Sequence, residues 1–226
     1  MVCGDSFGIN RDNKLSWINW LSRMLKYPVD TYCQGGCSNY MTYLQYKNNN
    51  PEKYDIAIIL ITASHRIPIV KNNPHLCFMI DSNDLPKSKL LSIPNNYSQA
   101  LDSYMDYYFD REVNLFVSQQ SIQNIINRKP LRQKLFILNS GANENLHLDY
   151  KDSIYLPGSL YLILLEELHK SGFSSIPEYH KKYPDEKDKI NHLSPQNNYN
   201  LANFLKNVIL DENANRDLSK HNWTFN

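Results

Sequence analysis

The chain has 226 residues, of which 42% are hydrophobic and 21% are charged. This length and composition suit one globular domain with a substantial core and exclude a disordered polar segment. The 24 basic and 23 acidic residues leave a formal net charge of +1 and form no long block of one sign, so no basic stripe for nucleic acid is expected.

The first 33 residues predict two short strands and one helix. Residues 2–3 predict the end of a strand, and Gly-Asp-Ser at 4–6 predicts a sharp turn that displays a serine hydroxyl. Residues 15–25 predict a helix, and residues 29–33 predict a strand after Pro28. The apolar face of that helix is formed by Leu15, Ile18, Leu21 and Leu25.

A tight loop and a central strand follow. Gly35 and Gly36 free the backbone for the loop, after which residues 38–47 predict a helix. Residues 55–62 form a continuous β-branched apolar run that is too short for a lone helix. Such a run is typical of a parallel strand covered on both faces.

The second half predicts an insertion and further helices and strands. Residues 66–97 contain four prolines and predict an irregular insertion with little regular structure. The remaining expected elements are one or two helices over 98–128, a strand over 134–139, a helix over 158–170 and a helix over 195–209 that Ser194 caps and Pro195 begins. Residues 211–226 predict a polar C-terminal tail, usually frayed, whose Trp223 and Phe225 dock on the body or on a partner.

The alternation of short apolar strands with amphipathic helices predicts an α/β fold with a parallel sheet and helices on both faces. Ligand sites in such sheets lie beyond the carboxyl ends of the strands. The loops expected to converge at that edge are residues 4–6, 35–39, 62–66 and 140–143.

The cysteines and the first residues bear on cofactors and location. Four unevenly placed cysteines are too few for a disulfide scaffold and predict free thiols, and no ligand pattern predicts a metal or another cofactor. The four cysteines are Cys3, Cys33, Cys37 and Cys77. The sequence contains no apolar run of about 18 residues, so no membrane-spanning helix is expected, and residues 1–15 carry no signal-peptide pattern. A protein in the cytoplasm of the producing cell is therefore expected.

Four features taken together resemble the SGNH, or GDSL-type, hydrolase family. They are Gly-Asp-Ser at 4–6, Gly36, the loop after the 55–62 strand, and His192 in Asn-His-Leu-Ser-Pro. The Tyr-rich helix expected over 98–128 and the Thr-x-Ser-x-Arg loop at 62–66 also resemble SGNH-type proteins encoded by tailed phages, and this resemblance implies incorporation in a virion as a second location. The resemblance implies a flavodoxin-like three-layer α/β/α sandwich over residues 1–210, interrupted by the insertion at about 66–97 and followed by the 211–226 tail.

The resemblance also assigns roles. Ser6 is the expected nucleophile, His192 its base and Asp188 the acid that orients the histidine. The amides of Ser6 and Gly36, with the Ser64 side chain, form the expected oxyanion hole, and Arg66 brings positive charge to the substrate. The implied reaction is metal-independent hydrolysis of small acyl esters, with acetyl groups on carbohydrate as a candidate substrate.

Two departures from the family pattern support an alternative. The third motif usually reads Gly-x-Asn-Asp, and Ser64 stands in the place of its asparagine. The fourth motif usually has aspartate three residues before the histidine, where this chain has Lys189 and carries Asp188 one residue earlier. The alternative is a catalytically weak or inactive binding or structural module whose partners are virion or tail proteins. A flavodoxin-like nucleotide binder is less favoured, because no Gly-rich phosphate loop opens a helix. The oligomeric state stays open.

Overall fold

The computed structural model describes residues 1–9, 15–64, 66–69, 76–78, 110–141, 146–174, 178 and 192–224. Its main sheet consists of four parallel strands in the order β1-β2-β5-β6. These strands are β1 (Val2–Cys3), β2 (Ile56–Ile61), β5 (Lys134–Asn139) and β6 (Ile154–Ser159). The protein therefore has an α/β fold.

The two central strands are the apolar runs that the sequence predicted. β2 and β5 pair in register along six residues, from Ile56 opposite Lys134 to Ile61 opposite Asn139. Alternate side chains of each strand enter two separate hydrophobic clusters, one on each face of the sheet. Because both faces are covered, the strands need apolar residues at consecutive positions.

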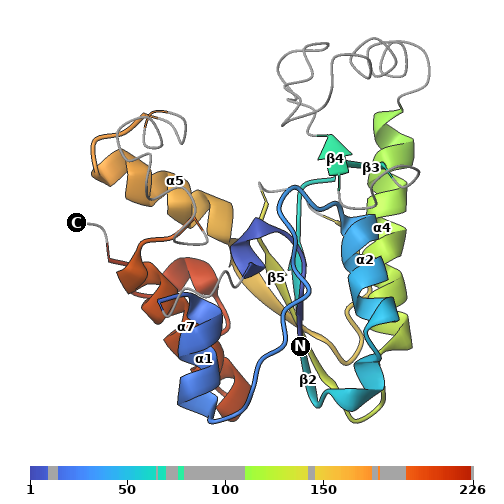
Figure 1. Cartoon of the computed structure of the whole chain (residues 1–226), viewed down its shortest axis with the longest axis horizontal. Helices are drawn as coiled ribbons and strands as arrows, with labels where there is room; N and C mark the ends of the chain where they lie inside the picture. The colour runs from blue at the N-terminus through green and yellow to red at the C-terminus, as the bar shows by residue number, and fades with distance from the viewer. Residues whose placement is uncertain are drawn as a thin grey trace.

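Helices cover both faces of the sheet (Figure 1). One face carries α1 (Trp17–Leu25), α5 (Leu160–Lys170) and α7 (Pro195–Leu210). The other carries α2 (Asn39–Asn48) and α4 (Arg111–Arg128). No helix among the described residues combines the length and apolar character needed to cross a bilayer.

Serine side chains cap the N-termini of four of these helices. Ser194 precedes α7 and accepts a hydrogen bond from Asn197 N–H at 3.2 Å, and Pro195 is the first residue of the helix. Both expectations are thus confirmed. Ser16, Ser38 and Ser159 cap α1, α2 and α5 in the same way. Each hydroxyl satisfies an amide that has no partner inside its helix.

Three local predictions are corrected. Residues 29–33 do not form a strand of the sheet, because Thr31 makes only an isolated bridge to Val2. The expected helix at 158–170 begins at Leu160, after β6, which the sequence did not predict because Pro157 and Gly158 disfavour strand structure. Leu15 precedes α1 and is 43% exposed, so it does not belong to the buried helix face.

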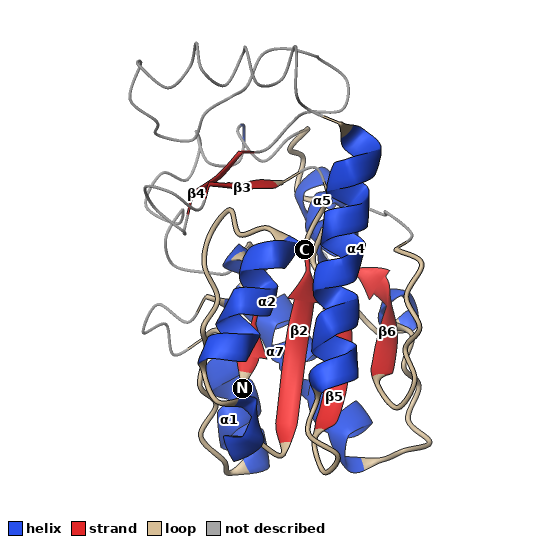
Figure 2. Cartoon of the chain, turned by 90° about the vertical axis from the view of Figure 1, so that its right-hand side faces the viewer, coloured by secondary structure: helices blue, strands red, loops and turns tan. Residues whose placement is uncertain are grey.

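The insertion contains regular structure that the sequence did not predict. β3 (Ile67–Ile69) and β4 (Leu76–Phe78) form an antiparallel pair. The rest of the insertion, at 70–75 and 79–97, lies outside the described residues, as does the first part of the helix expected over 98–128. The first turns of α4 extend past the carboxyl end of the sheet toward β3 and β4 (Figure 2).

The C-terminal segment is packed on the body as far as Thr224. The short 3-10 helix η5 (Leu218–Lys220) places Leu218 in the main core. Thr224 N–H donates to Asn197 Oδ1 at 2.9 Å, and Asn197 Nδ2 donates to Thr224 C=O at 2.8 Å. Trp223 docks through a hydrogen bond from Nε1 to Leu218 C=O, whereas Phe225 lies outside the described residues. The segment is therefore docked on the body and is not frayed there.

Replacing Leu218 with alanine is expected to lower the free energy of unfolding by about 2–5 kcal/mol, because its fully buried side chain would leave a cavity. Leu210→Ala is the matched control, since Leu210 is 65% exposed and its loss should change stability by about 0.5 kcal/mol or less. Urea unfolding of both variants measures the difference. Equal stabilities would contradict the docked position of the segment.

Candidate active site

The serine turn depends on a glycine. Gly4 follows β1 with φ +147°, a backbone conformation that side chains disfavour. A Cβ at this position would lie 2.4 Å from Leu60 Cβ on the neighbouring strand. Ser6 then opens the 3-10 turn η1 (Ser6–Gly8), and Asp5 caps it by accepting Phe7 N–H on Oδ1 at 3.2 Å. The chain thereby turns sharply, and Ser6 remains half-buried at the edge of the sheet.

The structure brings Ser6 and His192 together across 186 positions of sequence. His192 Nε2 lies 2.8 Å from Ser6 Oγ, within the range expected for a nucleophile and its base. The Phe7 ring packs against the imidazole, with ring centroids 5.0 Å apart. When Nε2 is unprotonated, this geometry allows it to accept the serine proton.

Three polar contacts fix the segment that carries His192. The backbone of His192 has a φ of +65°, which is uncommon for residues other than glycine. Asn198 Nδ2 donates to Leu193 C=O at 2.8 Å, and the Glu167 carboxylate accepts Ser194 N–H at 3.2 Å. The Ser194 cap is the third contact. Contacts of this kind hold a strained backbone in place.

The expected acid, Asp188, lies outside the described residues, so its role stays a prediction. Sequence reasoning did not identify Glu167 and Asn198 as supports of the histidine segment. Glu167 precedes His192 by 25 positions, and no local pattern connects the two.

Gly36 meets the stereochemical needs of an oxyanion donor. Its φ is +73°, and no atom lies within 4 Å of the position that a Cβ would occupy. Neither Ser6 N–H nor Gly36 N–H donates a hydrogen bond to another residue in the described part of the chain. Neither amide is therefore occupied by a hydrogen bond within the described residues.

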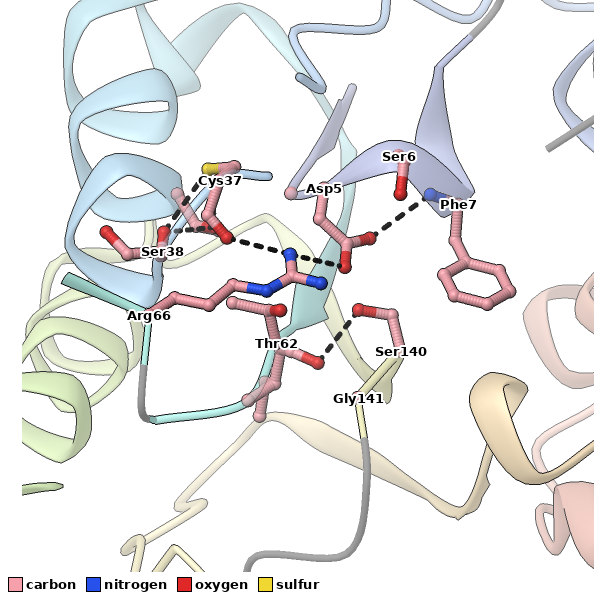
Figure 3. A network of polar contacts seen from close by, with 12 residues as sticks. Asp5, Ser6, Phe7, Cys37, Ser38, Thr62, Arg66, Ser140 and Gly141 are labelled. Carbon is pink, nitrogen blue, oxygen red and sulfur yellow. Dashed lines mark hydrogen bonds and ion pairs between the residues drawn. The ribbon is translucent and has the colours of Figure 1, made fainter. Parts of the chain in front are cut away.

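Arg66 connects the serine turn to the glycine loop (Figure 3). Its Nη1 donates to Asp5 Oδ2 and to Cys37 C=O, each at 3.1 Å. The Asp5 side chain is fully buried and the Arg66 side chain is 13% exposed. The structure thus places Arg66 in a buried ion pair, and the substrate contact expected of it stays a prediction.

Ser64 lies in the loop after β2, in the place expected from its sequence position. The residue is buried, and its C=O accepts a hydrogen bond from Asn114 Nδ2 of α4. Asn39 holds the start of the same loop, accepting Thr62 N–H at 2.9 Å and donating to Thr62 C=O at 2.8 Å. The loop is therefore anchored to two helices. A hydrogen bond from the Ser64 side chain to an oxyanion stays a prediction.

Gln45 is a support that the sequence did not reveal, because a glutamine inside a helix carries no local signal. Its Oε1 accepts Gly4 N–H at 2.7 Å and its Nε2 donates to Gly4 C=O at 3.2 Å. Gln34 N–H also donates to Gly4 C=O, at 3.0 Å.

The loops at the carboxyl edge of the sheet are also joined to one another and to the strands. Ser140, after β5, donates to Ile61 C=O at 2.9 Å. Arg66 thus links loop 62–66 to loops 4–6 and 35–39, and Ser140 links the start of loop 140–143 to the end of β2. Residues 142–143 lie outside the described residues.

The neighbouring cysteines are poor alternatives as nucleophiles. Cys3, Cys33 and Cys37 are free thiols. Burial raises the pKa of Cys3 to about 12 and raises the pKa of Cys33 well above its ordinary value. Since the thiolate is the nucleophilic form, these two groups are inert near neutral pH. In the described part of the chain, no three His, Cys, Asp or Glu residues form a group that fits a metal ion.

No protein-family model, curated protein or solved structure matches this chain. The fold and the geometry define an α/β protein with a serine–histidine pair at the carboxyl edge of its sheet. That pair and the groups around it are the features of the molecule that bear on its function.

Proposed function

We propose that this protein is a serine hydrolase that cleaves small acyl esters through Ser6 and His192. The observation that carries the proposal is the 2.8 Å contact between Ser6 Oγ and His192 Nε2. A serine hydroxyl is a weak nucleophile by itself, and a base at hydrogen-bonding distance removes that limitation. The two free amides of Ser6 and Gly36 add donors of the kind that stabilise a developing oxyanion.

The proposed reaction proceeds in two half-reactions. Ser6 Oγ attacks the ester carbonyl carbon while His192 Nε2 takes the hydroxyl proton, and the carbonyl oxygen becomes an oxyanion facing the amides of Ser6 and Gly36. The tetrahedral intermediate collapses, and the alcohol leaves with the proton from His192. Water, activated by the same imidazole, then hydrolyses the acyl-serine and restores the free hydroxyl.

Substrate class and family are finer parts of the same proposal. The sheet with helices on both faces fits the three-layer α/β/α sandwich of SGNH-type hydrolases, with Asp188 as the acid that orients His192. Small acyl groups, including acetyl on carbohydrate, are the proposed substrates. The support for these points is the order of Gly-Asp-Ser, Gly36 and His192 along the chain.

A fluorophosphonate probe tests the nucleophile without knowledge of the natural substrate. The Ser6 oxygen should displace fluoride from phosphorus, and mass spectrometry should find the phosphonyl adduct on the peptide that contains Ser6. Ser6→Ala should abolish that adduct and His192→Ala should slow its formation strongly. His169→Ala, which changes an exposed histidine of α5, should have no effect. A folded protein that forms no adduct, or forms it on another residue, would overturn the proposal.

A further inference from the structure

The Asp5–Arg66 pair differs from the other ion pairs in the described part of the chain. Its side chains are 0% and 13% exposed, whereas the pair with the next least exposed carboxylate, Lys220–Asp217, is 73% and 23% exposed. Removing two charges from water costs several kcal/mol per ion, so a buried pair is weak evidence for stability by itself. The location of this pair suggests a more specific role.

One nitrogen atom of Arg66 joins two loops of the site. Nη1 donates to Asp5 Oδ2 and to Cys37 C=O, and Figure 3 shows the guanidinium lying between these two acceptors. Asp5 directly precedes Ser6, and Cys37 directly follows Gly36. Each acceptor thus belongs to a residue adjacent to Ser6 or Gly36, the two residues whose amides are proposed to bind the oxyanion.

The second oxygen of Asp5 extends the connection into the serine turn. Asp5 Oδ1 accepts Phe7 N–H, so the carboxylate holds the backbone on the far side of Ser6 while its other oxygen meets Arg66. Arg66 Nε is buried and makes no hydrogen bond with the described residues. Among the described residues, the guanidinium makes its hydrogen bonds through Nη1, to one acceptor in each of the two loops.

We infer that Arg66 is a positioning residue that sets the spacing between the Ser6 and Gly36 amides, acting through Asp5 and Cys37 C=O. This inference rests on the proposed function, because the spacing matters only if the two amides bind an oxyanion. Oxyanion donors act at defined distances from the developing charge, and a displacement of about 1 Å can lower a rate about 100-fold. Arg66 thus contributes to the transition state through the backbone, without contact with the reacting atoms.

Arg66→Lys tests the inference because it keeps the positive charge beside Asp5 but loses the length and planar geometry of the guanidinium. We expect kcat for a short-chain aryl acetate to fall about 100-fold, with KM within a few-fold of the unmodified protein. The fluorophosphonate adduct should still form on Ser6, but more slowly. Arg132→Lys is the control, since the Arg132 side chain is 68% exposed, and it should leave both constants unchanged.

Asp5→Asn is a second, independent variant that keeps the shape of the side chain and the acceptor for Phe7 N–H. It should also lower kcat while leaving KM nearly constant. Combining it with Arg66→Lys should lower kcat little further, because both changes break one connection. An unchanged kcat in the folded variants would overturn the inference, as would a rise in KM with kcat preserved, which would indicate direct substrate contact by Arg66. Full activity of Ser6→Ala would instead overturn the proposed function, so the two failures are distinguishable.

Discussion

Ser6→Ala is expected to lower kcat/KM for a short-chain aryl acetate by about three orders of magnitude or more. The alanine removes the atom that attacks the carbonyl carbon. The fold should stay in place, because Ser6 is half-buried and the hydrogen bond that its Oγ loses is the one to the proposed base, His192. Purified protein, assayed for release of the aryl alcohol beside the variant, provides the measurement.

His192→Ala should give a loss of similar size, since the hydroxyl then has no base. The double variant should be little worse than either single variant, because residues that act as one unit are strongly non-additive. Ser219→Ala and His169→Ala are matched controls at exposed positions and should retain full activity. If the unmodified protein and all four single variants are folded and equally inactive, the binding or structural module becomes the better interpretation. Partners in virions or tails would then be the next subject of study.

Gly4→Ala is expected to reduce the free energy of unfolding by about 3–5 kcal/mol, a large part of the stability of an ordinary domain. The added Cβ would lie 2.4 Å from Leu60 Cβ and 2.9 Å from Leu60 C=O, at a residue whose φ of +147° already disfavours a side chain. The atoms that the new Cβ would meet are the Cβ and backbone of Leu60 on the central strand β2, so the collision cannot be relieved by moving the end of a flexible side chain. Urea unfolding followed by circular dichroism measures the change.

Gly36→Ala is the matched comparison. Its φ of +73° makes the substitution unfavourable by about 1–2 kcal/mol, but nothing lies within 4 Å of the new methyl group. We therefore expect a smaller loss of stability than for Gly4→Ala, together with a loss of ester hydrolysis, because the methyl group occupies the open space beside the amide. Equal stabilities of the two variants would contradict the close packing of the serine turn on β2.

Much of the framework could be predicted from the sequence because its signals are local. The apolar runs of β2 and β5 are too short for helices and too continuous for exposed strands, so their placement in the centre of a parallel sheet followed. Ser194 and Pro195 marked the start of α7 for equally local reasons. The site prediction used the same framework, since the carboxyl ends of parallel strands meet at one edge, and the structure places Ser6 and His192 within hydrogen-bonding distance there.

Local patterns failed where neighbours in space decide the structure. Phe116 and Ile122 are both apolar residues of the helix expected over 98–128, yet Phe116 is 61% exposed whereas Ile122 is fully buried in the cluster on the sheet. Leu218 lies in a polar stretch that predicted a tail, and it is fully buried because β6 and Gly158 provide a surface for it. In both cases, the pattern within the segment is the same whether or not another segment covers it.

The sequence by itself determined the α/β class, the central strands and the candidate roles of Ser6 and His192, because strand propensity, helix capping and motif order are properties of neighbouring residues and their succession. Only the tertiary structure decided which groups support the site. Gln45 holds Gly4, Asn198 holds the His192 segment, and Arg66 pairs with Asp5 across 61 positions. These contacts depend on the distance and direction between side chains from different elements, and the folded arrangement of the sheet and its helices determines both.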